Sequence, residues 1–357
     1  MMSREEVRKW LHENDPLRLA ELYSQADTVR KNYVGDEIHL RGLVEISNHC
    51  LQNCAYCGLR RDNVVVERYR MSDSEILECA YAAVSRGYGT IVLQSGEDYG
   101  LEPDRISCLV SRIKEETPLA VTLSLGERFP EELASWREAG ADRYLLKFET
   151  SDDELYERIH PALPNRVYSR KGLLRVIKDL GYEVGSGIMI GLPGQSYDAL
   201  INDLFLFCEM GLDMIGAGPF LPHPETPLGQ DATYARLPEG EQVPGTEEMA
   251  YKVIALTRIL CPDANIPGTT ALASLNREEG RKLALQRGAN VVMPNLTPGT
   301  YRRCYEIYPE KLCFHEDAEW EHAQLMQMLA DLGRPPGKGS GGRRGGSCTC
   351  AAKEMLL

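Results

Sequence analysis

The chain has 357 residues, of which 43% are hydrophobic, and it carries a formal net charge of -13. This length and apolar content allow one large domain or two smaller ones. The acidic balance argues against a nucleic acid or a membrane surface as the main partner. The sequence has no apolar run of about 18 residues for a transmembrane helix. Because the charged N-terminus also lacks the apolar core of a signal peptide, we expect a cytoplasmic protein.

The first part of the chain, residues 1–36, is predicted to be a helical extension. Residues 5–33 have an amphipathic helical pattern, which Pro16 divides into two helices. The extension precedes the first predicted strand.

Residues 37–332 alternate between short apolar runs and amphipathic segments. The apolar runs predict strands at residues 40–46, 90–94, 120–125, 143–148, 187–190, 214–216, 265–267 and 290–293. The segments between them predict helices at residues 73–86, 104–116, 130–139, 152–159, 171–180, 197–210, 246–260 and 277–287. Ser72 and Glu75 form a capping box at the first of these helices. This alternation indicates a parallel α/β sheet, and its length of about 250 residues matches a closed (β/α)8 TIM-type barrel. A doubly wound open sheet is the alternative.

Three cysteines share one short loop after the first predicted strand. Cys50, Cys54 and Cys57 have the spacing C-x3-C-x2-C, which brings three thiolates around one soft centre. No histidine follows at a zinc-finger offset, so three thiolates without a fourth ligand indicate an iron–sulfur cluster with one open iron. Three buried structural cysteines are the alternative, but such residues have no need to share one loop.

Polar and glycine residues gather at the ends of the other predicted strands. They lie at residues 95–98, 124–127, 149–150, 191–195, 216–224, 269–270 and 294–301. In a barrel all of these segments meet on one face, where active sites are built.

The C-terminal tail, residues 333–357, is rich in glycine, proline and arginine, and we predict that it is disordered. Cys348 and Cys350 form a C-x-C pair within it. This pair is either a thiol or metal-transfer site or two thiols on a frayed chain end, and the second interpretation is favoured.

The cysteine loop, with an aromatic residue at Tyr56, resembles the signature of radical S-adenosylmethionine (SAM) enzymes. Six further segments resemble the HydE family of FeFe-hydrogenase maturases: GTIVLQSGED, VTLSLGE, AGADRYLLKFET, GLPGQ, GPFLPHPETPL and YRRCYEIYPEKLC. The resemblance covers residues 31–332. Methylornithine synthase and biotin synthase are relatives of that family.

The resemblance implies that Cys50, Cys54 and Cys57 hold three irons of a 4Fe-4S cluster, whose fourth iron chelates SAM. One electron then cleaves SAM to methionine and a 5'-deoxyadenosyl radical. The residues implied to contact SAM are Tyr56, Ser95, Gly96, Glu97, Ser124, Glu149, Arg170, Met189 and Leu192. Glu149 suits the ribose hydroxyls and Arg170 the methionyl carboxylate. The alternatives are a core aromatic for Tyr56, a solvated basic face for Arg170 and ordinary barrel core for Met189 and Leu192.

The substrate side implied by the resemblance consists of Arg41, Thr122, Lys147, Met214, Thr269, Thr270, Tyr305 and Tyr308. Arg41 lies within a predicted strand, where an unpaired charge is costly, so it indicates an anionic or cyanide-bearing ligand. A salt bridge within the barrel, for example to Glu45, is the alternative. Lys147 departs from the family pattern, in which we expect arginine, and it lacks the bidentate fork of a guanidinium.

The function implied is maturation of the FeFe-hydrogenase H-cluster. The substrate would be a small organometallic iron complex bearing CO, cyanide and cysteine, supplied by partner maturases, with a separate electron donor. Cys313 matches the first of three cysteines that bind a second cluster in some HydE proteins, but no cysteine follows in residues 314–322, so no second cluster is expected. The alternatives are a methylornithine synthase-like lysine mutase and a catalytically silent iron–sulfur scaffold.

Overall fold

The computed structural model describes residues 2–163, 167–231, 237, 238, 240–309 and 318–343. Two helices precede the sheet, α1 (Arg4–His12) and α2 (Pro16–Val34). Pro16 occupies the first turn of α2, where its missing N–H is not needed, and the Asp15 side chain caps the helix by accepting a hydrogen bond from the Leu17 N–H. The predicted division of the N-terminal region at this proline is therefore confirmed.

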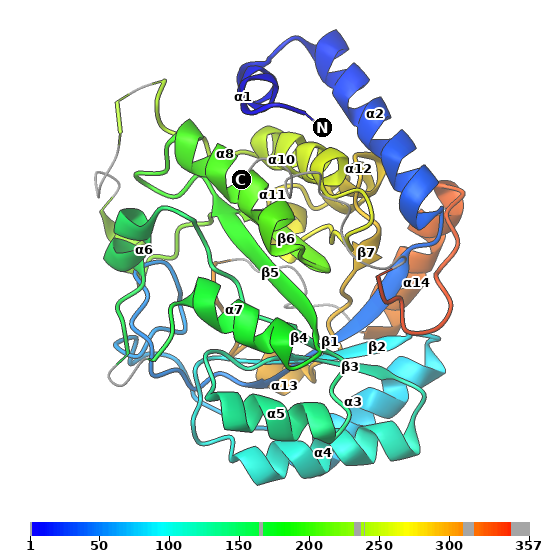
Figure 1. Cartoon of the computed structure of the whole chain (residues 1–357). Helices are drawn as coiled ribbons and strands as arrows, with labels where there is room; N and C mark the ends of the chain where they lie inside the picture. The colour runs from blue at the N-terminus through cyan, green and yellow to red at the C-terminus, as the bar shows by residue number, and fades with distance from the viewer. Residues whose placement is uncertain (1, 164–166, 232–236, 239, 310–317, 344–357) are drawn as a thin grey trace.

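A curved parallel sheet forms the centre of the molecule (Figure 1). Its strands are β1 (His39–Ser47), β2 (Thr90–Ser95), β3 (Ala120–Ser124), β4 (Arg143–Leu145), β5 (Glu183–Ile190), β6 (Met214–Pro219) and β7 (Val291–Val292). Their order is β6-β5-β4-β3-β2-β1-β7, and each pair is parallel. Every residue of β1 is buried, as expected for a parallel strand covered on both sides.

The strand predicted at residues 265–267 is reduced to two isolated bridges. Asn265 pairs with Met214 of β6, and Pro267 pairs with Val291 of β7. Pro267 has no N–H to donate, which shortens the ladder at this point. Backbone bonds from Ile215 N–H to the Asn265 carbonyl (2.9 Å) and from Gly268 N–H to the Val291 carbonyl (3.0 Å) still join the two sheet edges. The predicted barrel architecture is confirmed, with its seventh position filled by bridges.

Helices cover the sheet from outside, with α3, α4 and α5 along one side and α8, α10 and α12 along the other (Figure 1). Their bounds are α3 (Asp73–Ser85), α4 (Pro103–Glu116), α5 (Pro130–Glu138), α6 (Asp153–Ile159), α7 (Arg170–Asp179), α8 (Tyr197–Met210), α9 (Pro227–Gln230), α10 (Glu247–Leu260), α11 (Thr270–Leu275), α12 (Gly280–Gln286), α13 (Gly299–Arg302) and α14 (Ala318–Asp331). The capping box at α3 is confirmed: the Ser72 hydroxyl accepts from the Glu75 N–H, and the Glu75 carboxylate accepts from the Ser72 N–H.

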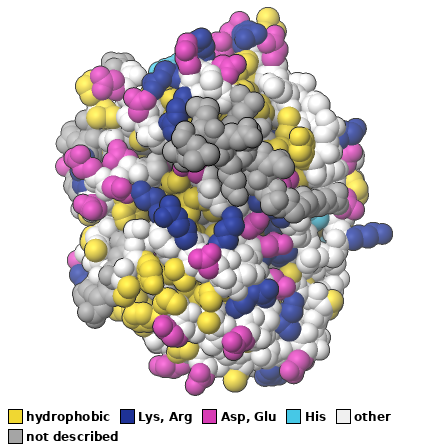
Figure 2. Space-filling model, viewed as in Figure 1, with side chains coloured by type: hydrophobic (Ala, Val, Ile, Leu, Met, Phe, Trp, Pro, Cys, Tyr) yellow, Lys and Arg dark blue, Asp and Glu magenta, His cyan; other side chains and the backbone are white. Residues whose placement is uncertain are grey.

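The surface is mixed in charge. Figure 2 shows acidic and basic side chains side by side on one face, without an extended basic field. No helix in the described part of the chain is both long and apolar enough to span a membrane.

The prediction of disorder from Gly333 onward is wrong for residues 333–343. We call residues 337–343 the C-terminal strap. It begins beside β1, where Ile38 exchanges backbone hydrogen bonds with Pro335 and Gly337 at 2.9 and 2.8 Å. It then crosses the amino ends of the strands. Composition could not reveal this order, because the strap is held mainly through its backbone carbonyls. Residues 344–357, with Cys348 and Cys350, lie outside the described residues.

Candidate active site

A cavity of about 370 Å³ runs along the inside of the barrel. It reaches from the cysteine loop at the carboxyl ends of the strands to Arg41, Met214 and Asn265 near their amino ends. The predicted residues in its wall are Cys50, Cys54, Tyr56, Cys57, Ser95, Gly96, Glu97, Ser124, Glu149, Arg170 and Met189 on the predicted SAM side, and Arg41, Lys147, Met214, Thr269, Thr270 and Tyr308 on the predicted substrate side. Segments far apart in sequence thus meet around one space.

The cysteine loop has no regular secondary structure, and Arg68 holds it in place. Its guanidinium donates to four backbone carbonyls, those of Asn48 (2.6 Å), Leu59 (2.9 Å), Arg60 (2.9 Å) and Asn63 (3.2 Å). Five N–H donors in a rigid plane suit this role. Arg68 therefore stabilises the conformation that presents all three thiols to the cavity.

Gly96 permits close contact between the β2 end and the cysteine loop. A Cβ at this position would lie 2.3 Å from the carbonyl oxygen of His49 and 2.9 Å from the Cβ of Cys50. The adjacent Glu97 N–H donates to the Cys50 sulfur at 3.4 Å, and the Leu51 N–H donates to the Glu97 carbonyl at 2.9 Å. Only glycine allows this approach, so the substitution of Gly96 by a larger residue would displace the first predicted cluster ligand.

The three thiols suit a polynuclear metal cluster. Burial raises the pKa of Cys50 and Cys54 above the usual value, and it raises the pKa of Cys57 to about 12. Buried thiolates therefore need a cationic partner, which bound iron supplies. Among the described residues no three histidine, cysteine or acidic side chains converge on a single ion. A cluster would fit this arrangement, because in an iron–sulfur cluster each thiolate would bind a different iron.

An irregularity in β4 directs two charged residues into the cavity. The regular strand stops at Leu145, and the chain returns to the sheet at Glu149, which pairs with Ile188 of β5. Glu149 has a φ of 65°, which makes it the single non-glycine residue with positive φ in the described chain. Such strain is concentrated at functional sites. Lys147 and Glu149 both line the cavity, with Lys147 Nζ 3.4 Å from Glu149 Oε2.

Arg170 is buried in the site, which contradicts the alternative of a solvated basic face. Its Nε donates to Glu127 Oε1 at 2.8 Å, and its Nη1 donates to the Lys147 carbonyl at 2.6 Å. His160 Nε2 lies 2.8 Å from Nη2. These contacts fix the guanidinium at the start of α7, where it faces the cavity beside Glu149.

Glu97 supplies a second carboxyl group at the same end. Burial raises its pKa to about 7, and Arg170 acts in the opposite direction. One carboxylate oxygen accepts a hydrogen bond from the Glu127 N–H. Glu97 and Glu149 together offer acceptors for an ammonium group and for hydroxyl groups near the cysteine loop.

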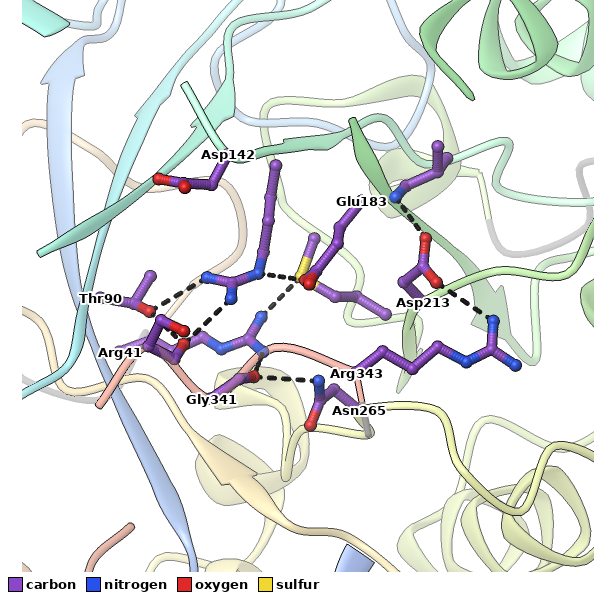
Figure 3. A network of polar contacts seen from close by, with 12 residues as sticks. Arg41, Thr90, Asp142, Glu183, Asp213, Asn265, Gly341 and Arg343 are labelled. Atoms are coloured by element: carbon purple, nitrogen blue, oxygen red, sulfur yellow. Dashed lines mark hydrogen bonds and ion pairs between the residues drawn. The ribbon is translucent and has the colours of Figure 1, made fainter. Parts of the chain in front are cut away.

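Arg41 lies at the opposite end of the cavity and is 3% exposed. Its Nη1 contacts the Met214 sulfur and its Nη2 donates to the Gly341 carbonyl at 3.1 Å (Figure 3). Among the described residues it forms no ion pair with Glu45 or with any other carboxylate, so the alternative of a salt bridge within the barrel is wrong, and its Nε has no hydrogen-bond partner there. Burial lowers the pKa of Arg41 to about 9. A buried cation without a carboxylate partner favours an anion in the adjacent space.

Three predicted site residues lie behind the cavity wall rather than in it. Leu192 packs in a separate apolar cluster with Ala55 and Leu155, against which Tyr56 and Met189 rest. Tyr305 is buried, and its hydroxyl accepts a hydrogen bond from Gln94, which does line the cavity, at 3.2 Å. Thr122 is fully buried within β3. The alternation of side chains along a strand and the packing of neighbours, which a sequence does not specify, place these residues one layer back.

The sequence analysis missed several residues of the site. Gln94 and Asn265 line the cavity, Arg68 holds the cysteine loop, and His160 contacts Arg170. A signal existed for Gln94 and Asn265, since a polar residue inside an otherwise apolar strand needs a partner. None existed for Arg68, because its contacts are to backbone carbonyls. Cys313 lies outside the described residues, so the absence of a second cluster stays a prediction.

Comparison with known proteins shows the family to which the chain belongs. The model of the radical SAM superfamily matches residues 44–207. The [FeFe] hydrogenase maturase subunit HydE of Thermotoga maritima is 46% identical over 342 residues, which cover 96% of this chain and 94% of the relative. The chain therefore belongs to the radical SAM superfamily. Membership implies a 4Fe-4S cluster and SAM as its cofactors.

Two further relatives place the chain within this superfamily. The 3-methylornithine synthase of Methanosarcina acetivorans is 31% identical over 94% of this chain and 90% of the relative. The crystal structure of methylornithine synthase (PylB) superposes with a TM-score of 0.80 at 26% identity, and the match covers 95% of both chains. Because identity to HydE is markedly higher, the chain is a HydE-like radical SAM enzyme.

Proposed function

We propose that this enzyme cleaves SAM reductively and uses the product to convert a small iron complex during maturation of the FeFe-hydrogenase H-cluster. The complex would carry CO, cyanide and cysteine. The observation that carries this proposal is one continuous cavity with three thiols at one end and the buried Arg41 at the other. The 46% identity to HydE supports the choice of pathway.

Residues at the cysteine end would bind and orient the cofactors. Cys50, Cys54 and Cys57 would hold the cluster, and Arg68 and Gly96 keep their loop in place. When bound, the cluster and SAM supply a one-electron cleavage that yields methionine and a 5'-deoxyadenosyl radical. The protein contributes orientation and the exclusion of competing reactions.

Charged side chains beside the cysteine loop would position SAM. Glu97 would accept from its ammonium group, Glu149 from its ribose hydroxyls, and Arg170 would donate to its carboxylate as a fork. Arg170 needs no rearrangement for this, because Glu127 and the Lys147 carbonyl already fix its plane. Tyr56 and Met189 would make apolar contacts with the adenine.

Cationic groups define the substrate end. Arg41 and Lys147 line the cavity there, together with Met214, Thr269, Thr270 and Tyr308. An anionic complex would compensate the charge of Arg41 in a space of low dielectric, whereas Lys147 already lies beside the Glu149 carboxylate. Lys147 carries a point charge rather than the planar fork of a guanidinium. Its Nζ lies 3.4 Å from a Glu149 oxygen, so it connects the predicted substrate side with the predicted SAM side of the cavity.

The test uses reconstituted enzyme, reductant and SAM with a synthetic ferrous complex that bears CO, cyanide and cysteine. We expect the complex to accelerate 5'-deoxyadenosine formation and to be consumed, as followed by its CO and cyanide infrared bands. Failure of the complex to change either signal would contradict the proposal.

A lysine mutase like 3-methylornithine synthase is the second candidate, and the 31% identity and TM-score of 0.80 favour it. Incubation with lysine in the same assay separates the two, because formation of methylornithine would overturn the maturase proposal. A catalytically silent scaffold would be reduced normally yet never produce 5'-deoxyadenosine.

A further inference from the structure

The C-terminal strap lies at the amino ends of the barrel strands, opposite the cysteine loop. Its backbone carbonyls accept hydrogen bonds from side chains at or near the amino ends of β1, β2 and β4, and from Asn265 beside β6. Ser340 accepts from Thr90 Oγ1 at 2.9 Å and from Arg143 Nη2 at 3.0 Å. Gly341 accepts from Arg41 and from Asn265 Nδ2, both at 3.1 Å (Figure 3).

Two of these donors, Arg41 and Asn265, also line the cavity. The Gly341 carbonyl therefore lies directly behind the end wall of the cavity, where it accepts a hydrogen bond from one edge of the Arg41 guanidinium. A guanidinium has five N–H donors, and those of Arg41 that do not reach Gly341 or Met214 remain for a ligand. Its Nε is buried without a partner.

One ion-pair cluster fastens the end of the strap. Arg343 forms a bidentate pair with Asp263, through Nε at 2.9 Å and Nη2 at 2.8 Å, and its Nη1 lies 3.1 Å from Asp213 Oδ1. Burial disfavours the charge of Arg343, but its hydrogen bonds to both aspartates raise its pKa overall. Bidentate pairs of this kind fix geometry as well as charge.

Between Gly337 and Arg343 the strap contains no apolar side chain to bury. It is therefore held by hydrogen bonds and by Arg343, without the hydrophobic burial that stabilises the barrel. Segments with few apolar contacts open at lower cost than a protein core. This leaves Arg343 as the side chain on which the position of the Gly341 carbonyl depends.

We propose that the C-terminal strap, fastened by Arg343, positions Arg41 to bind the anionic part of the substrate. Arg343 and Gly341 are positioning residues, since they act through Arg41. The inference rests on one part of the proposed function, namely that the cavity binds an anion.

The test opens the strap in two independent ways in the full-length reconstituted enzyme. Arg343→Ala removes the ion pairs. Gly89→Ala acts by steric exclusion, because its Cβ would lie 1.6 Å from the Gly339 carbonyl oxygen. Arg343→Lys is the conservative variant, and Arg175→Ala, which removes an exposed arginine of α7, is the control.

Trypsin cleavage after Lys338, followed by mass spectrometry, measures opening of the strap without reference to activity. Binding of thiocyanate, followed by its infrared C–N stretch, measures the anion site. Both opening variants are expected to be cleaved about 10-fold faster or more and to bind thiocyanate about 5- to 10-fold more weakly. In both opening variants the KM for the iron complex should rise, whereas the KM for SAM should stay unchanged. Arg343→Lys should recover part of each effect, and Arg175→Ala should match the wild type.

Faster cleavage with unchanged thiocyanate affinity would overturn the proposal, as would unchanged cleavage in both opening variants. So would thiocyanate binding that is absent from the wild type or retained in Arg41→Met. If Arg343→Ala does not fold, Gly89→Ala decides the same question. A wild type that binds thiocyanate through Arg41 but never converts the iron complex would refute the proposed function and leave the strap proposal standing.

Discussion

The two ends of the cavity are built in different ways. At the cysteine end, eight consecutive residues contain all three predicted cluster ligands, and a side chain from the same loop region, Arg68, donates to four carbonyls on either side of them. At the other end, Arg41 is held by the backbone of a segment 300 positions away in sequence. The first end has a local sequence signature, whereas the second depends on a long-range contact made by a strap that lacks apolar anchors.

This difference separates two tasks. In the proposed function the cysteine end holds a reactive cofactor in fixed geometry, and the loop fixed by Arg68 and by the close contact at Gly96 suits that task. In the same proposal the far end accepts and releases a small substrate, and a strap held by polar contacts suits that task. Substitutions at the two ends should therefore affect different kinetic constants.

The largest effect is expected from Cys54→Ala at the cysteine end. With one of three thiolates missing, the cluster cannot be held, and 5'-deoxyadenosine formation should fall by a factor on the order of 1000 or more. The iron content of the reconstituted protein should fall in parallel. The matched control is Cys108→Ala, which removes an exposed cysteine of α4 and should leave both quantities at the wild-type level. SAM cleavage that survives in Cys54→Ala would refute the assignment of this loop.

Arg41→Met tests the far end. Loss of a charged hydrogen-bonding partner, roughly 1.5–3 kcal/mol, should raise the KM for the iron complex by about 10- to 100-fold. The same change should stabilise the fold by about 1 kcal/mol or more, because it replaces a buried charge that lacks a carboxylate partner with an apolar side chain of similar length. Steady-state kinetics and thermal unfolding measure the two effects. A variant that loses stability would mean that Arg41 is structural.

Glu149→Gln tests the junction between the two ends. The amide keeps the shape of the side chain but weakens acceptance from ribose hydroxyls, so the KM for SAM should rise by about 10-fold. The KM for the iron complex should change less. Glu154→Gln, on the exposed face of α6, provides the control. Equal changes in both constants would contradict a role of Glu149 that is specific to SAM.

The sequence was sufficient to predict the cysteine loop and the barrel, because both depend on local patterns. Spacing alone groups Cys50, Cys54 and Cys57, and alternation of apolar runs with amphipathic helices defines a parallel sheet. The capping box of Ser72 and the break at Pro16 follow from residues that are close in the chain. Such features need no knowledge of the rest of the fold.

The strap and the β4 irregularity could not be predicted in this way. Glycine-rich composition indicates disorder unless a partner elsewhere satisfies the backbone, and the partners of Gly341 are Arg41 and Asn265. The sequence places Glu149 just after the fourth predicted strand. Its positive φ occurs where it pairs with Ile188 of β5, and the sequence does not specify that contact. Both features depend on contacts between distant segments.

The smallest expected effect concerns the buried carboxyl group of Asp203, which lies outside the cavity wall near the carboxyl ends of β4 and β5. Asp203 of α8 is fully buried, accepts a hydrogen bond from the Ser151 N–H at 2.5 Å, and lies 3.4 Å from Gln195 Nε2. It thereby joins the segments that follow β4 and β5. Burial raises the pKa of Asp203 to about 7, whereas an unfolded chain has a pKa near 3.8 for this group.

The sign of the pH effect follows from that difference. Below about pH 4 the carboxyl group is protonated in both states, and as the pH rises toward 7 the unfolded chain ionises first and gains stability relative to the native state. The wild type should therefore lose stability over this interval, and Asp203→Asn, which cannot ionise, should lose less. The Tm of the variant relative to the wild type should increase from pH 5 to pH 8, by about 2–4 °C for each kcal/mol that the variant gains over the wild type in free energy of unfolding. A difference in Tm that stays constant with pH would show that Asp203 is ionised throughout, and that its hydrogen bonds outweigh its burial.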